Sequence, residues 1–396
     1  MTTAIRTLVM CAAVLRVVPS SVSNAAAQQP ADSVGQSWEY DSQLLRYRVE
    51  VVATGVHVPW GLAFLHNGRA LVSDRAVGQL SLLDIHTGVL TRVAGVPAVY
   101  DSVDAGLLDV AVHPDYARNG WIYYAYASMT DSGSTTVVER ARLRDTRLVD
   151  RQRLFLAYPA VSSSHHFGSR LVLQKGYLFI TLGERDIREL AQELWTDHGK
   201  VIRLYDDGRV PRDNPFVGRP GARPEVWSYG HRNPHGLTLH PQTGELWETE
   251  HGPLGGDEIN IIRPGLNYGW PIVTYGREYD GGLVGDGLTQ REGMEQPVYH
   301  YATSAALSGL TFYTGGAFPQ WRGNLFVGAM APRYLGRLIL ENGRVVREER
   351  LLGEKRWRVR VVQQGPDGLL YLGIEEGRDG FGGMIVRLRP ADGSTR

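Results

Sequence analysis

Two short segments combine glycines with side chains that can move protons or hold an anion. His165 and His166 stand directly before a Phe-Gly turn, and a histidine on a loop is a common general base. Arg232 and Asn233 lie in the run 227–236, where a guanidinium beside an amide can bind a carboxylate or a quinone oxygen. Both segments also have a structural interpretation. The histidines would then be structural or surface residues with no catalytic role, and the Arg-Asn pair would cap a turn.

A second arginine pair lies near the C-terminus. Arg358 and Arg360 alternate along an apolar run, and in a strand they would share one face. The chain has only three lysines against 39 arginines, so we expect its functional cations to be guanidiniums. Two guanidiniums on one face favour an anionic ligand, and the alternative is a solvated strand face.

The segment 250–260, followed by 265–271, has the composition of a calcium site. Its glycines and Pro253 expose backbone carbonyls, while Asp257 and Glu258 supply carboxylate oxygens. Hard oxygen ligands of both kinds suit Ca²⁺ better than Zn²⁺. An ordinary acidic turn is the alternative.

The elements that must position these residues are short strands joined by turns. Six similar phrases recur at intervals of 45 to 73 residues, at 61–64, 106–110, 168–172, 236–239, 309–312 and 360–362. Most are followed by a turn rich in Gly, Asn or Asp and then by a second apolar strand, which is the pattern of β-hairpins. Six such units predict an all-β fold, a six-bladed β-propeller, rather than a pair of β-sandwiches. The run 187–195 is the one plausible short helix.

The composition narrows the class of partner. Lys+Arg and Asp+Glu both number 42 and 43% of residues are hydrophobic, which is typical of a globular protein. Without a basic excess, neither a nucleic acid nor an anionic membrane is the expected partner. Beyond the N-terminus no apolar run is long enough for a membrane span. A small polar metabolite is the better expectation.

The N-terminus has the features of a secretory signal. Arg6 precedes the apolar run 8–18, and the alanines at 25–27 offer a cleavage site. We therefore predict a signal peptide at 1–27, a flexible segment at 28–37 and a single propeller domain at 38–396. Cleavage would remove Cys11, the only cysteine, and the mature protein would be periplasmic or secreted.

In order, these segments resemble the soluble quinoprotein sugar dehydrogenases of the glucose/sorbosone dehydrogenase family, most closely the aldose sugar dehydrogenase branch. The matching phrases include GLLDVAVHPDY, HHFGSRLVL, EVWSYGHRNPHGL, EHGPLGGDEINII and QGPDGLLYL, and they run from about residue 59 to 389. The resemblance implies a six-bladed propeller that binds pyrroloquinoline quinone (PQQ) and calcium. It also implies oxidation of an aldose at the anomeric carbon to the lactone, with hydride transfer to the quinone.

The resemblance also assigns roles to residues. His166 matches the general base, and Arg232 matches an arginine that contacts PQQ and stabilises charge developing on its oxygens. The other residues matching PQQ contacts are Asn233, Tyr279, Arg358 and Arg360. For calcium, Gly252 and Pro253 match carbonyls near the cofactor, and Glu258 with the backbone oxygen of Tyr268 matches a structural site.

Two positions depart from the family pattern. Asp104 stands where the family has a glutamine that helps bind PQQ, so an anion is directed toward an anionic cofactor. Ala331 stands where the family has a lysine that contacts the quinone oxygens, and Arg333 is a candidate to replace it. These departures leave two other hypotheses open: a calcium-dependent hydrolase of sugar lactones, and a noncatalytic extracellular propeller. The dehydrogenase hypothesis requires a sugar substrate and an external electron acceptor, since the chain has no Cys-x-x-Cys-His haem motif.

Overall fold

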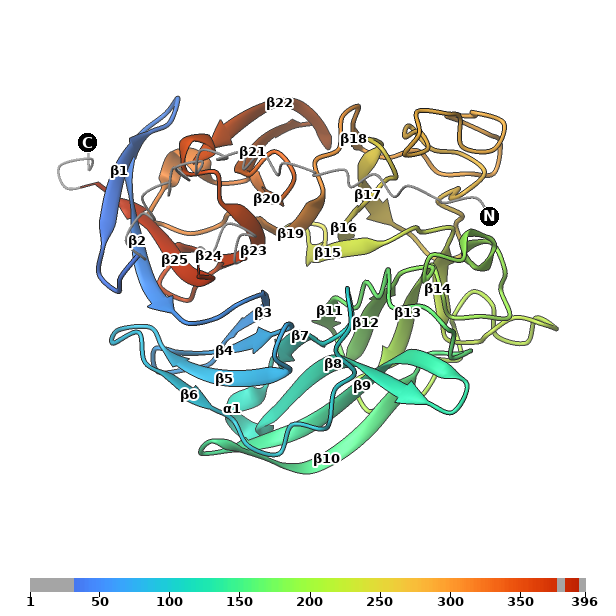
Figure 1. The fold of residues 1–396 in the computed structure, drawn as a ribbon, viewed down its shortest axis with the longest axis horizontal. Coiled ribbons are helices and arrows are strands. Elements are labelled where there is room, and N and C mark those ends of the chain that lie inside the picture. The colour runs from blue at the N-terminus through green and yellow to red at the C-terminus, as the bar shows by residue number, and fades with distance from the viewer. Residues whose placement is uncertain (1–31, 376–381, 392–396) are drawn as a thin grey trace, which may run out of the picture. The chain divides into compact units, whose positions relative to one another are not determined.

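The computed structural model describes residues 32–375 and 382–391, which form six antiparallel sheets around a common centre (Figure 1). The first three sheets are β3 (Pro59–Phe64), β4 (Arg69–Asp74), β5 (Gln79–Asp84) and β6 (Leu90–Arg92); β7 (Leu107–Val112), β8 (Trp121–Thr130), β9 (Gly133–Arg144) and β10 (Arg147–Leu156); and β11 (Leu171–Gln174), β12 (Tyr177–Leu182), β13 (Lys200–Tyr205) and β14 (Val226–Tyr229). The next two are β15 (Pro234–Leu239), β16 (Leu246–Glu250), β17 (Asp257–Ile262) and β18 (Tyr299–Tyr301); and β19 (Leu307–Phe312), β20 (Leu325–Ala329), β21 (Tyr334–Glu341) and β22 (Arg344–Leu351).

The sixth sheet joins the two ends of the described chain. Its strand order is β1 (Ser37–Asp41), β2 (Arg46–Thr54), β25 (Met384–Pro390), β24 (Leu370–Glu375) and β23 (Arg358–Gln364). Strands β2 and β25 pair antiparallel from Tyr47↔Pro390 to Thr54↔Met384. Hydrogen bonds between the first and last parts of the chain therefore hold the ring closed.

The strands β3, β7, β11, β15, β19 and β23 line the centre, each in contact with the next, and β23 contacts β3. All six phrases found in the sequence overlap these strands, which confirms the predicted six-bladed β-propeller. Glycine recurs in the phrases because the strands approach closely. A Cβ at Gly61 would lie 2.7 Å from the amide nitrogen of Val110, and one at Gly309 would lie 2.9 Å from the carbonyl oxygen of Arg360.

The N-terminal lead-in is partly attached to the sixth sheet. The amide of Gly35 donates to the carbonyl of Val51, the amide of Val51 donates to Gln36, and Ser37 pairs with Glu50. The sheet therefore begins before residue 38, because the backbone groups of β2 have partners there. The predicted signal at 1–27 and residues 28–31 lie outside the described residues.

Helix is rare in the described chain, which has α1 (Tyr116–Asn119) and three 3₁₀ helices, η1 (Arg188–Ala191), η2 (Pro319–Trp321) and η3 (Gly353–Lys355). The helix predicted at 187–195 is thus only the four residues of η1. The ammonium of Lys200 accounts for its end, since it binds the carbonyl oxygens of Leu190 and Ala191 at 2.8 and 3.0 Å. In the described residues no helix has the length and apolar character to cross a bilayer.

Candidate functional site

The residues singled out in the sequence gather at one end of the inner strands. His166 precedes β11, Arg232 and Asn233 precede β15, and Arg358 begins β23. Because the inner strands run in the same sense in successive blades of a propeller, residues that precede them meet at the same end of the centre. This end of the ring is the candidate site.

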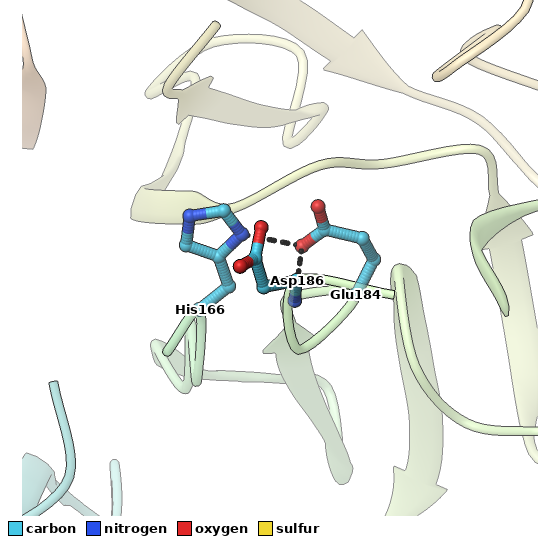
Figure 2. A group of neighbouring side chains, drawn as sticks. All are labelled: His166, Glu184 and Asp186. Carbon is cyan, nitrogen blue, oxygen red and sulfur yellow. Dashed lines mark hydrogen bonds and ion pairs between the residues drawn. The ribbon is translucent and has the colours of Figure 1, made fainter. Parts of the chain in front are cut away.

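His166 is held by a buried glutamate. Its Nδ1 lies 2.6 Å from Oε2 of Glu184, whose side chain is only 1% exposed (Figure 2). An ionised carboxylate only accepts hydrogen bonds, so Nδ1 carries the proton and Nε2 is left with a lone pair. The arrangement is that of a general base oriented by an acid.

The backbone around this pair is unusual. His166, Arg185 and Asp186 all have positive φ, at 50°, 64° and 58°, which non-glycine residues seldom adopt. The amide of His166 donates to Oδ2 of Asp104 at 3.2 Å, and the amide of Asp186 donates to Glu184 at 3.3 Å. Figure 2 shows the exposed carboxylate of Asp186 beside the ring of His166 and the carboxylate of Glu184.

Arg232 and Asn233 are both buried beside this pair. The Nη1 of Arg232 donates to the carbonyls of His251 and Gly252 at 3.2 and 2.8 Å, and its guanidinium lies 5.2 Å from the ring centre of Trp270. The Nε of Arg232 and the Oδ1 of Asn233 have no hydrogen-bond partner among the described residues. Buried polar atoms in this state are suited to a bound polar ligand.

Tyr279 lies at the exposed edge of the same site. Its hydroxyl is 3.4 Å from Nη2 of Arg232, and the residue is 71% exposed. The neighbouring Glu278 forms a two-bond ion pair with Arg188 of η1, at 2.5 and 2.8 Å. The pair links the β12–β13 loop to the long β17–β18 loop beside Arg232.

Arg358 and Arg360 share a face, as predicted, and they also share a partner. Both donate through Nε to Glu375 at the end of β24, at 3.3 and 2.6 Å. Burial alone would raise the pKa of the Glu375 carboxyl group, but the charges of Arg360 and Arg358 outweigh it and lower the pKa below its usual value. The Nη1 of Arg360 has no partner among the described residues, so the cluster retains a donor for an anion.

A buried acidic cluster lies on the face of β16 and β17. The amide of Asn260 is 3.1 to 3.4 Å from carboxylate oxygens of Glu248, Glu250 and Glu258. Burial, and then the charge of Glu250, raise the pKa of both Glu248 and Glu258 well above the usual range. His231 also faces the cluster, with Nδ1 3.5 Å from Glu250.

Three of the four predicted calcium ligands surround one small cavity. It measures about 10 Å³ and is lined by Gly252, Glu258 and Tyr268, together with Glu250. This is close to the space needed by one water-sized sphere. Two carboxylates, Glu250 and Glu258, line the cavity and favour a cation there, and Arg232 also lines it. The side chain of Tyr268 bonds to the backbone at Ile261 and Arg263, so only its backbone oxygen is a candidate ligand. The fourth, Pro253, does not line this cavity; its carbonyl lies 3.5 Å from the Ser304 hydroxyl.

The two departures from the family pattern differ in their surroundings. Asp104 lies near two buried arginines. Burial lowers the pKa of Arg75 and of Arg185, and the charge of Asp104 partly opposes this lowering. Ala331 is exposed after β20, and the guanidinium of Arg333 contacts the carbonyl of Arg356 at 3.4 Å. The charge of Asp104 is therefore offset by nearby arginines. For Arg333 to take the place of the family's lysine, its guanidinium would have to leave the carbonyl of Arg356.

The sequence reasoning missed several acidic members of the site: Glu184, Glu375, Glu248 and Glu250. Glu184 follows Gly183 directly after the apolar run of β12, and this position at the end of a strand is the pattern that could have pointed to it. Glu248 and Glu250 alternate in β16 with Glu258 opposite, but that pairing depends on the strand register.

The six-bladed ring thus carries a basic site with an oriented histidine at one end of its inner strands. The sequence model of the glucose/sorbosone dehydrogenase family matches residues 56–386. The chain belongs to this family.

Individual relatives agree with the assignment. The chain is 40% identical to aldose sugar dehydrogenase YliI of Escherichia coli over 347 residues, covering 86% of this chain and 92% of the relative. It is similar to a crystal structure of a glucose dehydrogenase, with 44% identity, a TM-score of 0.82 and coverage of 86% and 98% of the two chains. The PQQ-bound aldose sugar dehydrogenase of Streptomyces coelicolor is 28% identical, with a TM-score of 0.70 and coverage of 90% and 98%.

Proposed function

We propose that this protein oxidises an aldose at its anomeric carbon to the lactone with PQQ as cofactor and His166 as general base. The observation that carries the proposal is the pair of His166 and buried Glu184 beside arginines with unpaired donor atoms. The family relationship supports the same reaction. Bound PQQ would supply the two-electron acceptor that takes the hydride from the sugar.

The base step is assigned to a single atom. The Nε2 of His166 takes the proton of the anomeric hydroxyl, and Glu184 stabilises the resulting imidazolium through Nδ1–H. Burial, and then Arg232, lower the pKa of nearby His251 to about 3, so that histidine stays neutral and does not compete for the role.

The arginines and one tyrosine would hold the cofactor. Arg358 and Arg360 would bind its carboxylates, while Arg232, Asn233 and Tyr279 would contact its ring system and quinone oxygens. The orphaned Nη1 of Arg360 and Nε of Arg232 fit a ligand with several negative oxygens.

Calcium completes the proposal. Glu258 and the backbone oxygen of Tyr268 hold a structural ion, with Glu250 and Glu248 in position to add carboxylate oxygens. Gly252 and Pro253 offer carbonyls to a second ion at the cofactor. We further propose a periplasmic or secreted location and an external electron acceptor.

The test is titration of the calcium-loaded apoprotein with PQQ, followed by dye reduction with a panel of aldoses. We expect saturable, calcium-dependent turnover that His166→Ala lowers by at least about 100-fold, with PQQ affinity retained. His165→Ala is the matched control, since that exposed neighbour makes no contact with Glu184 among the described residues. Failure of the wild-type protein to bind PQQ would refute the proposal and favour the hydrolase or the binding propeller.

A further inference from the structure

A buried arginine outside the proposed chemistry crosses the centre of the ring. Arg170 directly precedes β11 and is 6% exposed. Its Nε donates to the carbonyl of His235 at 2.5 Å, its Nη1 donates to the carbonyl of Trp60, and its Nη2 lies 3.4 Å from the carbonyl of Arg360. These carbonyls belong to β15, β3 and β23. In the ring order β23 is directly opposite β11, so this side chain spans the centre.

The charge of Arg170 is balanced inside the ring. Its Nη1 lies 3.4 Å from Oδ1 of Asp109 in β7, and the other oxygen of Asp109 accepts the amide of Leu171 at 2.9 Å. Burial lowers the pKa of Arg170, and the Asp109 charge opposes this. One side chain therefore bonds to four other blades through three carbonyls and one carboxylate.

Arg170 also lies between a cavity and the ring of Trp60. A funnel of about 590 Å³ lies at the other end of the inner strands, lined by apolar side chains from all six: Phe64, Val112, Leu173, Leu239, Leu310 and Val362. Arg170 and Asp109 line its inner end. On the other side stands Trp60, with the guanidiniums of Arg170 and Arg360 at 5.4 and 4.6 Å from its ring centre.

We propose that Arg170 is a positioning residue that fixes the inner strands beneath the site. By binding the carbonyl of Arg360 it holds the backbone that carries this anion-binding guanidinium. The effect on PQQ rests on the proposed function, whereas the effect on the inner strands does not. Four bonds from one planar cation set the spacing of four blades, which a lysine with a single ammonium cannot reproduce.

The experiment uses Arg170→Ala, Arg170→Lys and a control, Arg203→Ala. Arg203 is similarly buried, at 5% exposed, but the side chains it hydrogen-bonds to, Asn214 and Asp213, both lie in the β13–β14 loop of its own blade. The first readout is hydrogen–deuterium exchange of the apoprotein. We expect faster exchange in 58–62, 232–237 and 358–362 for both Arg170 variants, and no change there for Arg203→Ala.

The second readout is chemical rescue. In Arg170→Ala the funnel leads to the vacated space, so a few millimolar guanidinium chloride should restore slow exchange where sodium chloride does not. We expect PQQ affinity to fall at least about tenfold in this variant and to recover with guanidinium. Arg170→Lys, which keeps the charge, should fold and show an intermediate loss of affinity.

Unchanged exchange in the three segments, or rescue by neither salt, would overturn the positioning role. If the wild-type protein does not bind PQQ, the proposed function fails, and the exchange result still decides the role of Arg170. Should Arg170→Ala fail to fold, Arg170→Lys replaces it in the exchange measurement: faster exchange supports the proposal and wild-type exchange refutes it.

Discussion

Replacing Glu184 by glutamine tests the base assignment directly. The substitution keeps the size of a side chain that is 1% exposed and lies 2.6 Å from Nδ1 of His166. It removes the charge that stabilises the imidazolium. A glutamine amide can also donate to Nδ1, which places the ring proton on Nε2 and removes the lone pair that accepts the substrate proton.

Two effects act on the same proton-transfer step, so they are not additive and the larger one sets the magnitude. Loss of a hydrogen bond to a charged group costs about 1.5–3 kcal/mol, which corresponds to about 10- to 150-fold in rate. Loss of the correct tautomer removes general-base catalysis, which is worth about 10² to 10⁴. We therefore expect kcat of Glu184→Gln to fall by about 10² to 10⁴, with PQQ affinity within about threefold of wild type, because Glu184 holds the base and not the cofactor.

The assay is steady-state dye reduction over a range of pH, with PQQ affinity measured by separate titration. Glu193→Gln is the matched control, an exposed glutamate of the same loop, and it should retain wild-type kcat. Raised pH should not restore Glu184→Gln, since the defect is the tautomer. Activity within threefold of wild type would refute the assignment of Glu184, and an equal loss in Glu193→Gln would indicate a general effect on the loop.

Three further outcomes are expected. Because the pKa values of Glu248 and Glu258 are raised in the folded state, these two groups make the calcium-free protein less stable as pH rises above about 4.3. Bound calcium opposes this loss of stability. In scanning fluorimetry a chelator should therefore lower the Tm more at pH 8 than at pH 5. Equal shifts at both pH values would contradict the site. Asp104→Asn should change PQQ affinity by less than about threefold, given its compensating arginines, and tighter binding by tenfold in the titration would show repulsion instead. Burial lowers the pKa of Lys200 to about 7, so this residue makes wild-type stability rise between about pH 7 and 10. Lys200→Met should lose about 1–3 kcal/mol of stability, because the carbonyls that Lys200 binds are left unpaired, and should also lose the rise with pH. A pH profile of urea unfolding identical to that of the wild type would exclude this role of Lys200.

The propeller could be predicted from the sequence because its inner strands share a local constraint. Glycines such as Gly61 and Gly309 recur where backbones of neighbouring blades nearly touch, and turns follow at short range. The helix predicted at 187–195 is too long because Lys200, which binds the last carbonyls, acts from a strand beyond it.

The sequence predicted site residues that lie next to one another along the chain. It did not predict their partners, which are distant in sequence. Arg232 and Asn233 form a visible pair, and alternation placed Arg358 and Arg360 on one face. Their partner Glu375 comes from the next strand, and Glu184 reaches His166 from 18 positions away. Such pairings depend on register and loop path, which no local pattern encodes.

The closure of the ring by β2 and β25 has a consequence for how the molecule is made. Arg387 bonds to Glu50 across 337 positions, so this contact cannot form until β25 has been synthesised. Contacts of such sequence separation are slow to form, and a nascent chain keeps the edge of β2 unpaired until then. Synthesis of β25, rather than any local folding step, therefore sets the earliest moment at which the ring can close. A chain truncated before β25 is expected to stay open and to associate through the unpaired edge of β2.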